Sequence, residues 1–137
     1  MKKLLVAAII SLSSITTVAL AEIKVGIILG FTGPIESLTP AMRDGARLAF
    51  LEASNSGNLL DGETLTIMLA DSTCVDSAAA TAAAEQLVAD GVAAIMGADC
   101  SGVTGAVNAN VAVPNGVLMV SPSATSPGLS KIADNGT

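Results

Sequence analysis

The chain has 137 residues, of which six are basic and twelve acidic, and it contains no His, Trp or Tyr. The absence of His excludes Ser-His-Asp triads, Cys-His dyads and His-based metal sites. A net charge of −6 and only two Phe residues do not suit nucleic acid, which requires a basic face and gains from aromatic stacking. With 51% hydrophobic residues, the composition indicates one acidic globular domain.

The first 21 residues have the pattern of a secretory signal peptide. Lys2 and Lys3 precede an apolar segment from Leu4 to Ile10, and Ala19-Leu20-Ala21 forms an A-x-A cleavage site. Ser and Thr residues between positions 11 and 17 interrupt the apolar run, which disfavours the alternative of a membrane anchor. We expect cleavage to leave one exported domain, residues 22–137, with no later segment apolar enough to span a bilayer.

The first half of that domain predicts a strand, a helix and a second strand. Residues 23–30 (IKVGIILG) are apolar and β-branched, as in a strand buried on both faces. After a loop from Phe31, Thr39 is the expected N-cap of a helix with Pro40 at its first position. The helix ends near Asn55, and residues 65–70 (LTIMLA) form the next strand. The apolar face of this helix is Met42, Ala46, Ala49, Phe50 and Ala53.

The second half repeats the alternation. Asp76 or Ser77 caps an Ala-rich helix that ends at Gly91, and small side chains let such a helix lie close against a sheet. Residues 92–97 (VAAIMG) are the third strand, and a third helix is expected from Ser101 to about Ala112. A turn at residues 114–116 leads into the fourth strand, 117–120, and then into a loop, 121–127 (SPSATSP).

This order of elements, βαβαβαβ, predicts an α/β fold. Right-handed crossovers give an open, doubly wound parallel sheet with helices on both faces. Four strands make a thin sheet, and residues 135–137 carry no signal that ends a fold. We therefore expect residues 22–137 to be an incomplete lobe.

Open α/β sheets bind ligands outside the carboxyl ends of their strands. The four loops expected there, residues 31–39, 71–76, 98–101 and 121–127, contain no Lys or Arg. Ser101 opens a helix directly after a strand, where unpaired N–H groups and the helix dipole suit a carboxylate. The alternative is that Ser101 merely caps its own helix.

The loop 121–127 is the second candidate for ligand binding. Thr125 can both donate and accept hydrogen bonds, as a zwitterionic ligand requires. The alternative here is an ordinary polar loop that leaves a strand.

Cys74 and Cys100 each lie just beyond the end of an expected strand. In an exported protein a disulfide is favoured, and closing this loop would contribute roughly 3 kcal/mol. The alternative is a metal site with Asp71, Asp76 or Asp99, but two Cys without His make a poor zinc set.

No cofactor or enzyme motif is present in the sequence. The glycines near the first strand do not form GxGxxG, and no phosphate-binding loop occurs. No side chain that could serve as a base accompanies Ser101, so we predict no metal, no cofactor and no enzymatic activity.

Taken in order, these motifs resemble the N-terminal lobe of type I periplasmic binding proteins, in particular the Leu/Ile/Val-binding family that serves ABC importers. The resemblance covers essentially all of residues 22–137. The matching stretches are residues 23–27 (IKVGI), 32–34 (TGP), 44–49 (DGARLA), Asp71, Cys74, 97–101 (GADCS) and 121–127.

The resemblance implies a role for each matching residue. Ser101 corresponds to the serine that binds the ligand's α-carboxylate, and Thr125 to the residue that touches both carboxylate and ammonium. Ser123 and Ala124 correspond to the backbone positions beside it. Cys74 and Cys100 correspond to a family disulfide. Leu38 stands where the family often has an aromatic pocket wall.

The expected function is therefore that of a periplasmic, non-enzymatic solute-binding protein. It would bind an amino acid, branched-chain or otherwise small and apolar, between two lobes and deliver it to the membrane permease of an ABC importer. A ligand-sensing receptor or regulator, or a binder of amides or urea, could be built on the same lobe. The second lobe and its hinge are not in this chain.

Overall fold

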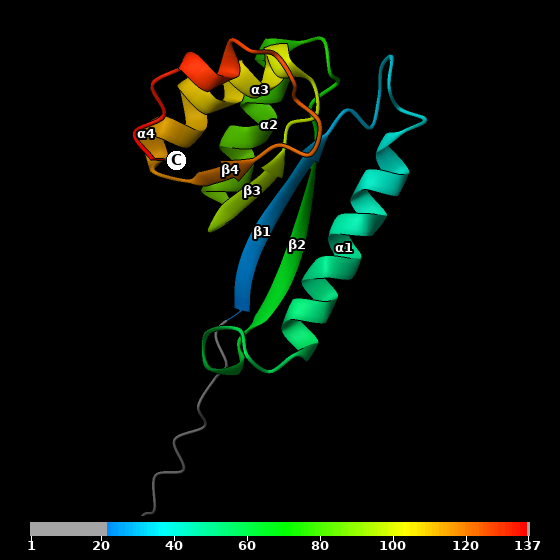
Figure 1. Ribbon diagram of the computed structural model, residues 1–137, viewed down its shortest axis with the longest axis vertical. Helices are drawn as coiled ribbons and strands as arrows, with labels where there is room; N and C mark the ends of the chain where they lie inside the picture. The colour runs from blue at the N-terminus through cyan, green and yellow to red at the C-terminus, as the bar shows by residue number, and fades with distance from the viewer. Residues whose placement is uncertain (1–21, 137) are drawn as a thin grey trace, which may run out of the picture.

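The computed structural model describes residues 22–136, so the predicted signal peptide, residues 1–21, lies outside the described residues. Strands and helices alternate as the sequence predicts (Figure 1). Short elements connect them: η1 (Leu60–Gly62), the π-helical η2 (Asn108–Ala112), α4 (Val113–Asn115) and η3 (Leu129–Lys131). The main elements are β1 (Glu22–Leu29), α1 (Thr39–Asn55), β2 (Thr64–Asp71), α2 (Ser77–Ala89), β3 (Ala94–Gly97), α3 (Ser101–Val107) and β4 (Leu118–Val120).

The four strands form one parallel sheet in the order β2-β1-β3-β4, which confirms the predicted fold class. The chain steps in one direction from β1 to β2 and in the other direction from β2 to β3 and β4. Right-handed crossovers then place α1 on one face and both α2 and α3 on the other, as Figure 1 shows. All four carboxyl ends consequently meet at the same edge of the sheet.

The hydrophobic core lies between the sheet and the α2–α3 layer. Ile28 of β1 and Ile95 of β3 point into it from the sheet and are at most 1% exposed. The predicted Ala-rich face of α2 and the Val positions of the third helix pack against them. The buried helix residues are Ala80, Ala84, Leu87, Val103, Val107 and Val111.

The opposite face of the sheet is only partly covered. Helix α1 packs on β1 and β2, and its predicted apolar face is partly buried, except that Ala49 is exposed. Beyond α1, Leu118 and Val120 of β4 remain 53% and 59% exposed. A cavity of about 340 Å³, lined by apolar side chains that include Val25 and Phe50, lies beside them.

Helix α1 begins one residue earlier than predicted, because Leu38 rather than Thr39 occupies the N-cap position. Thr39 is wholly buried, and its hydroxyl donates to the Glu36 carbonyl at 3.1 Å instead of capping the helix. The predicted cap at the second helix is confirmed, since the Asp76 carboxylate accepts the N–H groups of Ala78 and Ala79.

The third helix runs past Ala112, where it was predicted to end. It continues through the π turn and α4 to Asn115, and Gly116 then ends it with a φ of 63°. In a regular α-helix the Pro114 ring would clash with the carbonyl four residues earlier. The π turn widens the helix there, with the Val113 N–H bonded to the Asn108 carbonyl.

The strands also begin at slightly different residues from those expected. β3 starts at Ala94 rather than at Val92, because the Val92 N–H bonds to the Leu87 carbonyl at the end of α2. No helix among residues 22–136 is both long and apolar enough to cross a membrane.

Gly97, at the carboxyl end of β3, is held against β1. Its φ is +130°, and a Cβ at this position would lie 2.0 Å from the Ile28 carbonyl oxygen. Only glycine combines this backbone conformation with so close an approach of two strands. The position therefore sets how tightly the loop after β3 lies against β1.

We predict that Gly97→Ala destabilises the protein by at least about 1–3 kcal/mol, the cost of a strained backbone conformation alone. Gly45→Ala in α1 is the matched control, because nothing lies within 4 Å of a Cβ there. Alanine should stabilise that helix by about 0.5–1 kcal/mol. Urea unfolding measures both changes, and equal stabilities for the two variants would contradict the prediction.

Candidate functional site

Ser101 is the first residue of α3, with Cys100 in the N-cap position. Its hydroxyl oxygen accepts the N–H groups of Thr125 at 3.2 Å and Ser126 at 3.1 Å. The interpretation of Ser101 as only the cap of its own helix is therefore wrong. The side chain instead joins the loop after β3 to the loop after β4.

The loop after β4 is folded around a second hydroxyl, that of Ser121. This hydroxyl donates to the Ala98 carbonyl and accepts the N–H groups of Ala124 at 2.9 Å and Ser123 at 3.4 Å. The Ser123 hydroxyl donates to the Asp99 carbonyl at 2.8 Å. The structure thus brings Ser101, Ser123, Ala124 and Thr125 together, with Thr125 exposed and the other three partly exposed.

Leu38 stands apart from this group. It precedes α1, and its side chain is 56% exposed. The loop between β1 and α1 projects from the same end of the sheet but on the side away from α3 (Figure 1). The described residues therefore do not join Leu38 to Ser101 and Thr125.

Asp99 contributes a contact that the sequence did not reveal. Its side chain is 3% exposed and accepts the Gly30 N–H at 2.7 Å, the Ser72 hydroxyl at 3.1 Å and the Cys100 N–H at 3.0 Å. The sequence pattern indicates Asp99 only as a possible metal ligand. The signal that could have found this role is a carboxylate two residues after a buried strand, in an edge whose loops contain no basic side chain to pair with it.

Cys74 and Cys100 form a disulfide, as predicted, across a sequence separation of 26. The bond joins the loop after β2 to the residue that precedes Ser101. Among residues 22–136, no group of three or more Cys, Asp or Glu side chains is arranged to hold a metal ion.

Asp71, at the end of β2, holds the loops after β1 and β2 together. The Thr32 hydroxyl donates to it at 2.6 Å, and the Thr73 N–H donates at 2.8 Å. Partial burial raises the pKa of Asp71, but hydrogen bonds from Thr32, Thr73 and Phe31 outweigh it and hold this pKa below its ordinary value.

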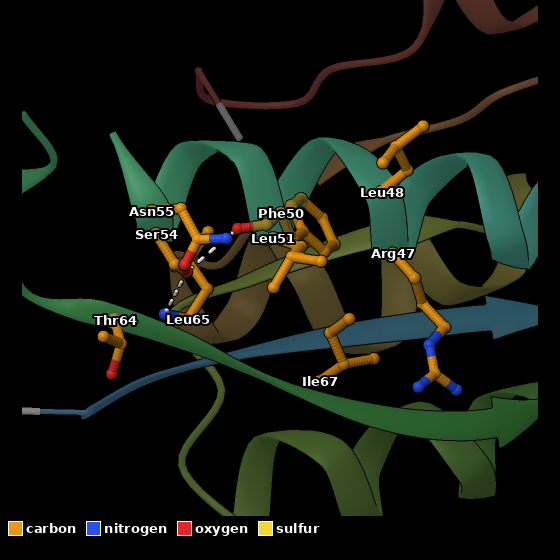
Figure 2. Close-up of a pocket in the computed structure, with 9 residues that line it drawn as sticks. All are labelled: Arg47, Leu48, Phe50, Leu51, Ser54, Asn55, Thr64, Leu65 and Ile67. Carbon is orange, nitrogen blue, oxygen red and sulfur yellow. Dashed lines mark hydrogen bonds between the residues drawn. The ribbon is translucent and has the colours of Figure 1, made fainter. Parts of the chain in front are cut away.

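A groove lies away from the loops after β3 and β4. Figure 2 shows a groove of about 400 Å³ between α1 and β2, where the Ser54 hydroxyl accepts the Leu65 N–H at 2.9 Å and donates to the Phe50 carbonyl. Arg47 and several apolar side chains line it. None of the sequence-predicted site residues does so.

A parallel sheet whose loop edge presents hydroxyl and main-chain groups is an architecture for binding small molecules. The chain belongs to the periplasmic binding protein family, whose model matches residues 22–135. This is a family of binding proteins.

Several relatives and solved structures are similar over most of this chain. The Leu/Ile/Val-binding protein BraC3 of Rhizobium johnstonii is 35% identical over 129 residues, which cover 94% of this chain and 34% of the relative. The branched-chain amino acid transporter substrate binding protein LivJ of Streptococcus pneumoniae, solved in complex with isoleucine, is 34% identical with a TM-score of 0.73. That match covers 81% of this chain and 31% of LivJ.

A third structure, an ABC transporter substrate-binding protein of Desulfitobacterium hafniense in complex with Leu, is 28% identical with a TM-score of 0.68. The match covers 85% of this chain and 33% of that protein. The chain thus spans about a third of the length of the relatives it matches.

We predict that replacing both Cys74 and Cys100 by Ser lowers the free energy of unfolding by roughly 3 kcal/mol, through loop-closure entropy in the unfolded chain. Urea unfolding of the variant beside the oxidised protein measures this difference. Two free thiols in the purified, denatured, unreduced protein would contradict the pairing.

We also predict that stability depends on pH through Asp71. Because folding lowers its pKa, ionised Asp71 stabilises the protein fully above the ordinary pKa, and this contribution is lost as the pH falls below about 4. The stability difference between the native protein and Asp71→Asn should therefore shrink from pH 6 to pH 3. Urea unfolding across that range tests this, and a constant difference would contradict it.

Proposed function

We propose that this chain is the N-terminal lobe of an exported solute-binding protein that delivers an amino acid, branched-chain or similarly small and apolar, to an ABC importer. The relatives support this assignment, because their names and structures refer to Leu, Ile and Val binding and to ABC transport. In this proposal residues 1–21 are cleaved as a signal peptide, residues 22–137 form one lobe, and the permease is the partner.

The observation that carries the proposal is the hydroxyl of Ser101. Two backbone N–H groups are directed at its oxygen, so the hydroxyl can donate its own proton outward. A carboxylate is the natural acceptor, because hydrogen bonds to a charged acceptor are stronger than those between neutral groups. We assign the α-carboxylate of the ligand to this position.

Thr125 lies beside Ser101 and is exposed, so its hydroxyl is available to both charged groups of a zwitterion. Ser123 and Ala124 serve as main-chain positions of the same loop, which Ser121 holds in shape. Leu38 lies apart from Ser101 and Thr125, so in this proposal it would contact only the far, side-chain end of the ligand from the first loop. Since the Leu38 side chain is exposed and aliphatic, it suits an apolar ligand.

The site recognises charge without a cationic side chain. The loops at this edge contain no Lys or Arg, so hydroxyl and N–H dipoles alone face the carboxylate. In the complete protein a second lobe would close over the ligand and exclude water, which strengthens such hydrogen bonds.

Calorimetric titration of the complete protein with leucine, isoleucine and valine tests the proposal, with urea and simple amides as alternative ligands. We expect an amino acid to bind and the amides not to bind. Amide binding alone, or no binding of any amino acid, would overturn the ligand assignment.

We predict that Ser101→Ala weakens amino acid binding by at least about 1 kcal/mol, roughly fivefold, through loss of a hydrogen bond to a charged group. Ser56→Ala is the matched control, because the Ser56 hydroxyl donates to the Ala53 carbonyl and accepts the Asn58 N–H at the far end of α1, away from the proposed site. The control should bind as the native protein does. An unchanged affinity in Ser101→Ala would remove Ser101 from the site.

A further inference from the structure

One buried residue, Asp99, is bonded to all four loops at the carboxyl edge of the sheet. Its carboxylate accepts from Gly30 after β1, from Ser72 after β2 and from the N–H of Cys100 in its own loop. Its backbone carbonyl accepts the Ser123 hydroxyl from the loop after β4.

The Asp99 carboxylate is stabilised by hydrogen-bond donors rather than by a basic side chain. Its side chain is 3% exposed, and the ion pair found among residues 22–136 joins Arg43 to Asp44 on the surface of α1. The negative charge therefore depends on the two N–H groups and the hydroxyl directed at it. Such charge-assisted hydrogen bonds are shorter and stronger than neutral ones, and the Gly30 N–H at 2.7 Å fits that description.

The loops come close together around this carboxylate. A Cβ placed on Gly30 would lie 3.2 Å from the Cβ of Cys74 and 3.4 Å from Oδ2 of Asp99. The disulfide then ties Cys74 to Cys100, which immediately follows Asp99. The loops after β1, β2 and β3 consequently cannot shift independently of Asp99.

The placement of the residues assigned to the ligand also depends on Asp99. Ser101 lies two residues after Asp99, and the Ser123 hydroxyl holds the loop after β4 to the Asp99 carbonyl. Thr125 is bonded in turn to Ser101. A change at the Asp99 side chain therefore reaches Ser101 through the backbone of the loop after β3. It reaches the loop after β4 through the Asp99 carbonyl and the Ser101 hydroxyl, not through contact with the ligand.

We propose that Asp99 is the positioning residue of the amino acid site: it sets the relative placement of the four loops and thereby determines ligand affinity. The inference rests on the proposed function for its effect on binding. The placement of the loops can be measured without any ligand, so the two proposals can fail separately.

The experiment uses Asp99→Asn in the complete protein. The amide keeps the size of the carboxylate but presents one N–H₂ group where an oxygen accepted, so either Gly30 or the Ser72–Cys100 pair loses its acceptor. Leu87→Ala is the control for lost stability, because Leu87 is 3% exposed in the α2 core and is not bonded to the loops.

Isoleucine and leucine affinities are measured by calorimetry at a temperature where circular dichroism shows every variant folded. We expect Asp99→Asn to weaken binding by about tenfold or more, the scale of one charge-assisted hydrogen bond, and Leu87→Ala to remain within about twofold of the native protein. Equal affinities in Asp99→Asn and the native protein, or equal losses in both variants, would overturn the inference.

Amide hydrogen exchange without ligand supplies the independent readout. Exchange at Gly30 and Thr125 should accelerate in Asp99→Asn but not in Leu87→Ala. If the native protein binds no amino acid, the proposed function fails, and unchanged exchange at Gly30 would then overturn the positioning role as well.

Ser72→Ala provides a second variant if Asp99→Asn does not fold. It removes the hydroxyl that donates to Asp99 at 3.1 Å and accepts the Cys74 N–H at 3.4 Å, and it leaves the Asp99 carboxylate in place. We expect faster exchange at Gly30 and a smaller loss of affinity, about threefold. No change in either quantity would contradict the inference.

Discussion

Strand β1 is the constraint on which the rest of the structure depends. It pairs with β2 on one edge and β3 on the other, and Val25 to Leu29 are buried in the middle of the protein. The first crossover starts from this strand and the second passes over it, which places α1 and α2 on opposite faces of the sheet. Because all the strands are parallel, their carboxyl ends meet at one edge. The loops that carry Ser101 and Thr125 are neighbours in space because β3, which pairs with β1, also pairs in parallel with β4.

At the carboxyl edge of the sheet, the Asp71 and Asp99 carboxylates are stabilised by hydrogen bonds rather than by ion pairs. Asp71 and Asp99 each accept several N–H and O–H groups, and the Ser101 oxygen accepts two more N–H groups. These hydrogen bonds give partners to backbone N–H groups and hydroxyls of the neighbouring loops, which would otherwise be unpaired. The partly exposed Ser101 and the exposed Thr125 lie at the surface of this edge.

The alternation of elements could be predicted because it depends on local patterns. The buried run in β1, the Asp76 cap and the Val spacing of the third helix are all visible within a few residues. The long-range partners were not visible. Nothing near Ser101 in sequence shows that its hydroxyl receives the Thr125 N–H, and Asp99 depends on partners up to 69 residues away. The residues of the candidate site could be predicted from their positions after the strands and from the family resemblance. Their hydrogen-bond partners could be identified only from the three-dimensional structure.

In the proposed function, the Ser101 hydroxyl binds the ligand carboxylate at the carboxyl edge of the sheet. A crystal structure of the complete protein with bound isoleucine is the most direct test. We expect the α-carboxylate within hydrogen-bond distance of the Ser101 hydroxyl, beside Thr125, with the four loops placed as they are here. Isoleucine bound elsewhere, as in the groove between α1 and β2, would contradict it.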